Sequence, residues 1–444
     1  SYSVTGVQTC ALPIYPDIAK MIQLGTITDV SMGCFPPGTP VMTSEGYKPI
    51  EEIHPSELLV DGDGYLTKIR NKQELHYKGP LTEIYIEGGA VIRCTPNHPL
   101  FKVKEQNICL CGCGEKLEEP KNKKKHLEKR FKQGHHQNIY NSMKIYASED
   151  VDEINKIREQ KGETEIEAIE AGDLKIGDYL VSPIGGSVIN SEIDVDLARL
   201  IGYFLAEGCL VYNNNKLTEV QFCFSIEEKD TLAAETIEII EKNFGHGPGI
   251  RIRKDNNNCI VWSSNKKIKQ FLLDNCNRYS YGKKLKNNIL FADPEIQKHI
   301  IGAWLSGDGY LRILPDEQEP STICGWTVSQ ELMEQMSFIL NRLGIYHTIH
   351  AVIEGKYTTI DTAKKYPKDF KGENNKRIAY CINIPSTYAR NIIDYCSFKK
   401  DNYRFSQRNG HRDIKNYLMK KISDIKTIDY DGMEIGRASC RERV

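Results

Sequence analysis

Two copies of one short pattern constrain the fold of this chain more than any other feature of its sequence. Each copy is an apolar helix that contains small residues and ends in an acid followed by glycine: Gly202-Tyr-Phe-Leu-Ala-Glu207-Gly208 and Gly302-Ala-Trp-Leu-Ser-Gly-Asp308-Gly309. In the first copy, apolar residues between 197 and 205 recur at the spacing of one helix face. The unit recurs after 101 residues, from Glu207 to Asp308. This period is longer than that of a solenoid and predicts two stacked α/β half-domains.

Strands and helices follow both acid-ended helices in a similar order. The first copy predicts strands over 220–224 and 249–263 and helices over 229–244 and 267–275. The second copy predicts a first helix over 296–309, strands near Thr327, Ile345 and Tyr380, and helices over 331–343 and 387–396. The repeat therefore extends over most of the second half of the chain.

The small residues of the two helices allow their backbones to approach closely, so we expect the carboxylates of Glu207 and Asp308 to converge. Two adjacent carboxylates do not both stay ionised without a cation, and Mg²⁺ that bridges them and a phosphate would remove the repulsion. Either acid alone could be an exposed helix end before a glycine, which is common there. The occurrence of both in a repeat favours a shared metal site.

These helices resemble the two signature helices of the LAGLIDADG homing endonucleases, over roughly residues 194–425. The resemblance implies a two-fold pseudo-symmetric α/β domain that cuts double-stranded DNA, with Glu207 and Asp308 as the metal-binding acids. The sequence departs from the family in one respect: Gly202 stands five places before its acid, whereas Ala303 takes that place in the second copy.

The same resemblance implies a lysine near the active centre and strands that lie in the major groove of DNA. Lys283 matches the lysine segment loosely, and a solvated charge run is the alternative. Arg251, Arg253 and Lys254 could contact phosphates or bases.

The region 34–103 reads as short alternating strands split by Gly and Pro, and therefore as all-β. A lysine-rich stretch over 104–165 interrupts it, and strand-like residues resume over 166–190. The stretches that begin at Cys34, Gly89 and Ala171 resemble, in order, three sequence blocks of the Hint module of inteins. That resemblance implies an all-β horseshoe, interrupted by the endonuclease, and autocatalytic protein splicing.

The residue types fit the first step of that reaction. The thiol of Cys34 can attack the carbonyl of Gly33 and convert the peptide bond to a thioester. By the resemblance, His98 protonates the departing nitrogen and Thr95 positions the carbonyl or the imidazole. A lone cysteine is more often a small buried hydrophobe, and the joint occurrence of the three blocks outweighs that alternative.

Both ends of the chain look foreign to the rest. Residues 1–14 and 435–444 resemble translated sequencing-adapter DNA, residues 15–33 the end of an upstream host protein, and 426–434 the start of the last Hint segment. We divide the endonuclease at 191–425 into halves over about 194–292 and 293–425. No terminal His-Asn pair is present, so we expect splicing to remain incomplete, with the covalently attached host (extein) protein as a partner.

A cysteine cluster lies inside the lysine-rich stretch. Cys109, Cys111, Cys113 and His135 could make a tetrahedral structural Zn²⁺ site. A basic insert with free thiols is the alternative reading, and the sequence does not decide between them.

The composition limits the remaining possibilities. The net charge of -1 gives no global basic field, so any DNA binding has to come from a local patch. No run reaches the ~18 apolar residues of a membrane span. The 14 cysteines are mostly scattered, from which we expect a reducing, cytoplasmic setting. We also expect a monomer and a microbial or viral host. Two further readings stay open: a DNA-binding scaffold that has lost cleavage, and a Hint autoprocessor with a structural insert.

Overall fold

A computed structural model describes most of the chain after residue 33. The described residues are 34–69, 72–104, 151–160, 165–245, 247–253, 255–313, 320–353, 356–358, 378–398 and 412–436. Gly33, Lys254 and the predicted zinc ligands Cys109, Cys111, Cys113 and His135 lie outside them. No helix among the described residues is long and apolar enough to cross a membrane.

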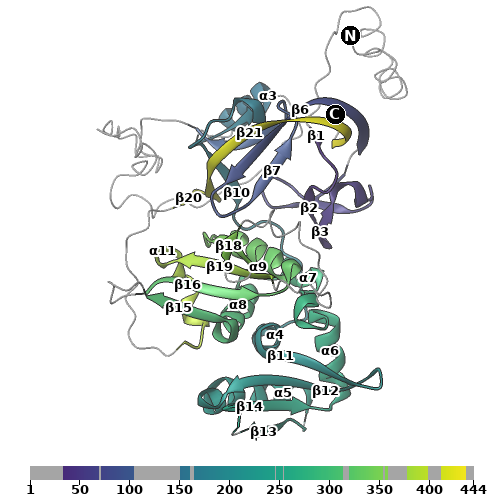
Figure 1. The fold of residues 1–444 in the computed structure, drawn as a ribbon, viewed down its shortest axis with the longest axis vertical. Coiled ribbons are helices and arrows are strands. Elements are labelled where there is room, and N and C mark those ends of the chain that lie inside the picture. The colour runs from purple at the N-terminus through teal and green to yellow at the C-terminus, as the bar shows by residue number, and fades with distance from the viewer. Residues whose placement is uncertain are drawn as a thin grey trace, which may run out of the picture.

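A β module occupies one end of the molecule, at the top of Figure 1. Its large sheet has the order β7-β6-β21-β10-β8-β9, with β1 and β20 also paired to β21, and its small sheet has the order β3-β2-β4-β5. The strands of the large sheet are β1 (Cys34–Phe35), β6 (Gln73–Ile86), β7 (Val91–Cys94), β8 (Pro99–Val103), β9 (Ile166–Glu170), β10 (Tyr179–Pro183), β20 (Asp413–Ile414) and β21 (Tyr417–Gly436). Those of the small sheet are β2 (Pro40–Thr43), β3 (Gly46–Pro49), β4 (Leu58–Val60) and β5 (Leu66–Lys68).

The β module is rejoined on the far side of the lysine-rich stretch. Strand β8 pairs antiparallel with β9 over five residue pairs, from Pro99 with Glu170 to Val103 with Ile166. Helix α3 (Val151–Gln160) packs beside β9, where the Asn155 amide both donates to the Ala168 carbonyl and accepts from its N–H. Segments that are far apart in the sequence therefore share one sheet.

Strand β21 is longer than the sequence patterns indicate. It runs for 20 residues and pairs with β6 from Ile422 to Gly436. The boundaries that we drew after residues 425 and 434 both fall inside it. The long partner β6 keeps the strand extended across both of them.

The first α/β half lies farthest from the β module, at the bottom of Figure 1. Its sheet has the order β11-β12-β14-β13. Helix α4 begins where the Asp194 carboxylate accepts from the N–H of Leu197, an N-cap that satisfies a free helix-end donor. The elements are α4 (Val195–Glu207), β11 (Gly208–Asn213), β12 (Lys216–Ser225), a π-helical turn Lys229–Ala233, α5 (Ala234–Phe244), β13 (Gly249–Arg253), β14 (Asn258–Ser263) and α6 (Lys266–Cys276).

The second half repeats this plan between the first half and the β module (Figure 1). Its sheet has the order β15-β16-β19-β17-β18, and Asp293 caps α8 as Asp194 caps α4. The elements are α7 (Asn287–Leu290), α8 (Pro294–Asp308), β15 (Gly309–Ile313), β16 (Pro320–Thr327), α9 (Gln330–Arg342), β17 (Thr348–Ile353), β18 (Lys356–Thr358), β19 (Ile378–Pro385) and α11 (Ser386–Ala389).

The helix that we predicted over 387–396 is wrong. Only α11 forms, followed by a 3₁₀ turn at Ile393–Tyr395. The segment packs directly on α8, where a Cβ on Gly302 would lie 2.4 Å from the Tyr395 carbonyl oxygen. This tertiary contact overrides the helical spacing of its apolar residues.

The two halves share one hydrophobic core. It contains α4 and α8 side chains, among them the fully buried Tyr203, Phe204 and Trp304, and it extends to Met42 and Leu418 of the β module. Arg342 of α9 ties the second half to the β module, since its guanidinium donates to the carbonyls of Gly185 at 3.0 Å and Ser187 at 2.8 Å.

Candidate functional site

Glycines bring α4 and α8 into direct backbone contact. A Cβ on Gly202 would lie 2.5 Å from the carbonyl oxygen of Ile300 and 2.6 Å from the Cβ of Ala303. One turn further along, a Cβ on Gly307 would lie 2.6 Å from the Cβ of Ala206. Because both contacts advance in the same direction along each chain, the helices run side by side and parallel. Their C-terminal ends therefore meet.

The acids Glu207 and Asp308 stand at these meeting ends. A Cβ on Gly307, the neighbour of Asp308, would lie only 3.2 Å from Oε1 of Glu207. Burial, and then the charge of Glu228, raise the pKa of Glu207 to about 7. Burial, and then the charge of Glu207, raise the pKa of Asp308 to about 7. The two predicted acids therefore repel each other in one partly buried site.

Lys283 lies at the same place and is not part of a solvated charge run. Its side chain is buried, with the residue 7% exposed. Its ammonium donates to the carbonyls of Leu205 at 2.9 Å and Ala206 at 3.2 Å, in the last turn of α4. Burial lowers the pKa of Lys283, and the charge of Asp308 is the first of the effects that oppose this shift. Its neighbours Lys284 and Lys286 are exposed, so the solvated reading holds only for them.

The backbone around Lys283 is fixed by the second half. The Ser329 hydroxyl donates to the Lys283 carbonyl at 2.7 Å, and the Gln335 amide oxygen accepts from the Leu285 N–H at 2.7 Å. The ammonium is thus held in place from both halves of the domain. The sequence alone could not show that Lys283 is buried here, because the carbonyls that its ammonium binds lie 78 and 77 positions earlier in the chain.

The donor set suits a divalent cation that also has ligands from outside the protein. Among the described residues no group of three or more His, Cys, Asp or Glu side chains could hold a metal ion. Glu207 and Asp308 are two hard oxygen donors whose mutual repulsion a cation would relieve. Mg²⁺ typically takes one or two carboxylates and fills its other positions with water and phosphate oxygens.

The outer face of the first sheet carries two of the predicted DNA-contacting residues. Arg251 makes two 3.1 Å hydrogen bonds to the Glu219 carboxylate, and its guanidinium lies 4.2 Å from the ring centroid of Trp262. Arg253 is exposed two residues further along β13. Arg251 is therefore held in one orientation, whereas Arg253 faces solvent.

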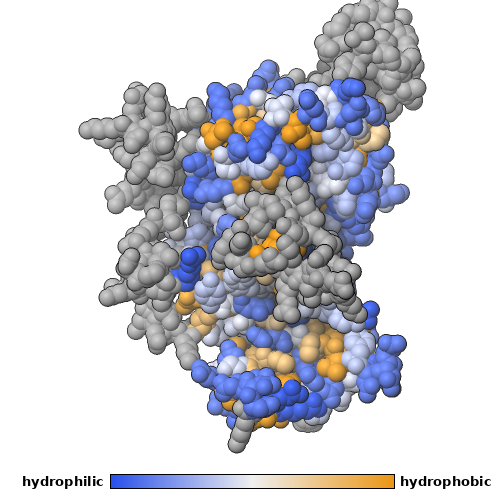
Figure 2. Space-filling view, viewed as in Figure 1, coloured by the Kyte–Doolittle hydropathy of each residue, from blue (hydrophilic) through white to orange (hydrophobic). Residues whose placement is uncertain are grey.

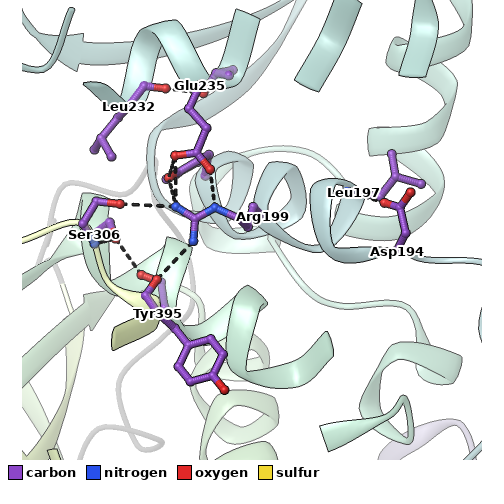
Figure 3. A network of polar contacts seen from close by, with 11 residues as sticks. Asp194, Leu197, Arg199, Leu232, Glu235, Ser306 and Tyr395 are labelled. Carbon is purple, nitrogen blue, oxygen red and sulfur yellow. Dashed lines mark hydrogen bonds and ion pairs between the residues drawn. The ribbon is translucent and has the colours of Figure 1, made fainter. Parts of the chain in front are cut away.

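A polar network that the sequence did not indicate connects the two halves on the other side of α4 (Figure 3). The Arg199 guanidinium forms an ion pair with Glu235 of α5 and donates to the Tyr395 carbonyl at 3.1 Å. The Ser306 hydroxyl of α8 accepts from the N–H of Ser397 at 2.8 Å. These contacts hold the segment after α11 against both central helices, and so support the approach of the two acids.

The second candidate site lies in the β module around Cys34. The Thr95 hydroxyl accepts a 3.0 Å hydrogen bond from the Cys34 N–H, and the Thr95 N–H donates to the Cys34 carbonyl at 3.0 Å. Cys34 is buried, with 3% of the residue exposed. The structure thus places the Thr95 hydroxyl against the backbone nitrogen of Cys34.

His98 lies beside these residues, in a turn that the rejoined segment supports. The ring centroid of His98 is 4.2 Å from that of Phe35. The backbone N–H of His98 donates to the Thr95 carbonyl at 3.0 Å. The N–H groups of Ala171 and Gly172 donate to the carbonyls of His98 and Pro96. The three sequence blocks that we singled out therefore meet at one place.

Comparison with known proteins identifies one part of the chain. Residues 295–378 match the family model of the LAGLIDADG-like domain. The chain thus contains a LAGLIDADG-like domain. The match begins in α8 and ends at the first residue of β19. It therefore includes strands β15, β16, β17 and β18 of the second sheet.

Several curated proteins are similar to longer parts of the chain. An ATP-dependent DNA helicase Hel308 of Thermococcus kodakarensis is 23% identical over 426 residues, which are 91% of this chain and 35% of the helicase. An uncharacterized protein of Methanocaldococcus jannaschii is 29% identical over 237 residues, 48% of this chain and 24% of that protein. A DNA polymerase of Thermococcus litoralis is 23% identical over 258 residues, 54% of this chain and 14% of the polymerase. The chain therefore spans about a third or less of these relatives' lengths.

Solved structures of homing endonucleases are also similar to part of the chain. The homing endonuclease I-DmoI in complex with DNA and Mn is 18% identical, covers 45% of this chain and 96% of its own, and gives a TM-score of 0.30. The homing endonuclease I-WcaI bound to its DNA recognition sequence is 13% identical, covers 49% of this chain and 89% of its own, and gives a TM-score of 0.32.

Proposed function

We propose that this protein is a metal-dependent DNA endonuclease of the LAGLIDADG homing type, with Glu207, Asp308 and Lys283 at one active site. The observation that carries the proposal is the convergence of two helix-end acids, each with its pKa raised to about 7, beside a buried lysine. Perturbed titration of several groups in one partly buried place is typical of active sites. The partner is double-stranded DNA.

Each of the three residues has a role that its environment supports. Glu207 and Asp308 would hold a divalent cation, with Mg²⁺ as our choice, which when bound supplies Lewis-acid activation of a phosphate and of an attacking water. Lys283 is fixed between the α4 carbonyls and the acids, so its positive charge stabilises negative charge that develops on the scissile phosphate. Arg251 and Arg253 extend the positive surface along β13.

A plasmid assay tests this function. Supercoiled plasmids that carry a pool of random inserts are incubated with the protein and Mg²⁺, and nicked and linear products are sequenced at their ends. We expect recurrent cut sites for the wild type and a loss of at least 100-fold for Glu207→Gln and for Asp308→Asn. Glu241→Gln, on the exposed face of α5, is the matched control and should cut normally.

Binding without cutting would support the alternative that the two-fold α/β scaffold has lost cleavage. A wild type that binds the plasmid pool tightly, yet leaves it supercoiled with Mg²⁺ or Mn²⁺, would contradict the endonuclease proposal. It would leave a DNA-binding module.

We also propose that the β module is an intein-type Hint module that rearranges the peptide bond before Cys34. The observation in favour is the reciprocal hydrogen bonding of Cys34 and Thr95 with His98 nearby. The Cys34 sulfur attacks the carbonyl carbon of Gly33, the C–N bond breaks, and the thiol proton ends on the Cys34 nitrogen. The product is a thioester with a free amine, and Thr95 and His98 assist the departure of that nitrogen.

Thiol-induced cleavage tests the second proposal. We expect dithiothreitol to release the segment before Cys34, and Cys34→Ala to abolish the release; Thr95→Ala should slow it by about 10²–10³-fold. Cys276→Ala, which removes a buried free thiol from the first α/β half, should leave the release unchanged.

A third reading, an autoprocessor with a purely structural insert, would show this cleavage and no affinity for DNA. The zinc site at Cys109, Cys111, Cys113 and His135 stays a prediction.

A further inference from the structure

Two stacked tyrosines stand exposed in the loop that leads to Lys283. The rings of Tyr279 and Tyr281 have centroids 5.6 Å apart and lie within 6° of parallel. The residues are 52% and 51% exposed, among the highest values for large apolar or aromatic residues in the described part of the chain. The guanidinium of Arg278 lies 5.0 Å from the Tyr279 centroid and 5.7 Å from that of Tyr212 on β11. We call Arg278, Tyr279 and Tyr281 the tyrosine platform.

The loop is built as a fixed shape. The Asn277 amide donates to the Gly282 carbonyl at 2.9 Å, and the Gly282 N–H donates to the Tyr279 carbonyl at 3.0 Å. Tyr279 has φ of +63°, a left-handed conformation that an aromatic residue adopts at a cost. The chain thus accepts backbone strain to keep a large apolar ring in water, which a purely structural loop does not require.

The platform lies close to the proposed active site. The Lys284 N–H donates to the Cys276 carbonyl at 3.1 Å, so the loop that carries the platform also contains Lys283. Tyr212 of β11 follows Glu207, the last residue of α4, by five residues, which places its backbone at most about 17 Å from that of the acid at ~3.3 Å per residue. That distance corresponds to about five nucleotide steps of 3.4 Å each along one strand.

The charges around the platform suit a nucleic acid. Arg278, Lys284 and Lys286 are all exposed, and of these Lys284 forms an ion pair with Glu331 at 3.1 Å. Asp274, four residues before Arg278, is also exposed and accepts a hydrogen bond from the Gln270 amide. In Figure 2, the surface of the first α/β half, at the bottom of the view, mixes apolar and hydrophilic residues. Aromatic rings beside cations are the usual means of holding unstacked bases next to a phosphate backbone.

We propose that the tyrosine platform stacks on an unstacked nucleotide of bound DNA, a few steps away from the site of cleavage. This inference rests on the DNA-binding part of the proposed function and not on the cleavage chemistry. Arg278 neutralises the adjoining phosphate, while the rings of Tyr279 and Tyr281 supply a sequence-tolerant surface for a base. The platform would therefore stabilise DNA that is locally opened or bent near the acids.

A binding experiment without divalent metal tests the platform. The full chain is titrated into a fluorescently labelled 20-nucleotide single strand that carries 2-aminopurine, and anisotropy and base quenching are both recorded. We expect the pair of changes Tyr279→Ala and Tyr281→Ala to weaken binding by about 10–100-fold and to abolish quenching. The matched pair Tyr279→Phe and Tyr281→Phe keeps both rings and should bind within about twofold of the wild type, and thermal melting confirms that each variant is folded.

Four outcomes decide this inference, and the last of them separates it from the nuclease proposal. It is overturned if the wild type does not quench the probe, or if the alanine pair binds and quenches like the wild type. It is also overturned if the phenylalanine pair is as weak as the alanine pair, since the hydroxyls and not the rings would then carry the contact. If the wild type never cuts DNA but the alanine pair loses quenching, the nuclease proposal fails and the platform stands.

Discussion

At the scale of single residues, the charges of Glu207, Asp308 and Lys283 determine the properties of the proposed active site. The two acids are held in a protein environment that favours their neutral forms, while the lysine is held in one that favours loss of its proton. Burial therefore raises the cost of every charge in this site, a cost that a bound cation and phosphate would offset. The site is therefore prepared for a charged ligand at the expense of stability of the free protein.

This arrangement predicts a specific pH dependence of stability. Both acids have a folded-state pKa of about 7, above their ordinary values of 4.5 and 3.8. The folded state therefore holds more protons than the unfolded state between those values, and stability falls as the pH rises from about 4 to about 7. We expect the loss, on the order of 2 kcal/mol for each acid, to be visible in denaturant melts at pH 5 and pH 8, and to shrink in the pair Glu207→Gln and Asp308→Asn. An equal loss in wild type and variant would contradict this account.

Replacement of the lysine should affect both activity and titration. Lys283→Met keeps the length of the side chain and removes its charge, so the pKa values of Glu207 and Asp308 should rise further and the pH dependence of cleavage should move upward. We expect a fall in cleavage rate of about 10²–10³-fold, measured as nicked plasmid over time. Lys267→Met, at an exposed position near the start of α6, should cut like the wild type.

At the scale of elements, the parallel contact of α4 and α8 decides whether the acids meet. In most helices a change of glycine to alanine stabilises by about 0.5–1 kcal/mol. At Gly202 the new Cβ would lie 2.5 Å from the Ile300 carbonyl oxygen, a backbone atom that cannot turn away. The clash should win, with a net destabilisation of about 1–3 kcal/mol, and the acids should separate.

The variant Gly202→Ala therefore tests the contact. We expect a lower melting temperature together with a loss of cleavage that added Mg²⁺ does not restore. Gly282→Ala is the control for stability, because the nearest atom to its Cβ would be 3.8 Å away. A stabilised Gly202→Ala would show that the helices are less closely packed than in this structure.

The elements also show how far the sequence alone could lead. The acid-ended helices, their order and the meeting of Glu207 with Asp308 followed from spacing and small residues. The burial of Lys283 could not, because its ammonium binds carbonyls of a helix 78 residues earlier. Two errors have one origin: the helix wrongly predicted over 387–396 and the predicted boundaries that fall inside β21. Both segments take their structure from contacts with distant parts of the chain, namely packing on Gly302 and pairing with β6.

At the scale of the whole molecule, the core continues from the α/β halves into the β module. Arg342 closes that junction: burial lowers the pKa of Arg342 to about 10, and its guanidinium lies 5.4 Å from the ring centroid of Phe291. Chain segments before and after the α/β domain meet in β10 and β21. The β module should therefore depend on the domain inserted in it.

Removal of the Arg342 side chain tests this dependence. Arg342→Ala would leave the carbonyls of Gly185 and Ser187 without their donors, at a cost of about 2–4 kcal/mol. We expect calorimetry to show two separate transitions in place of one, and thiol-induced cleavage before Cys34 to slow. A single transition at the wild-type temperature would mean that the junction contributes little.

The central claim is that Glu207 and Asp308 form one active site at the feet of two packed helices. The most direct measurement is a comparison of cleavage rates for Glu207→Gln, Asp308→Asn and the double variant on the same DNA, with the folded state of each verified. If the acids act on one cation, either change alone removes the reaction and the double variant is no slower than the slower single variant. If the two losses multiply, or if either single variant cuts as the wild type does, the shared site is refuted.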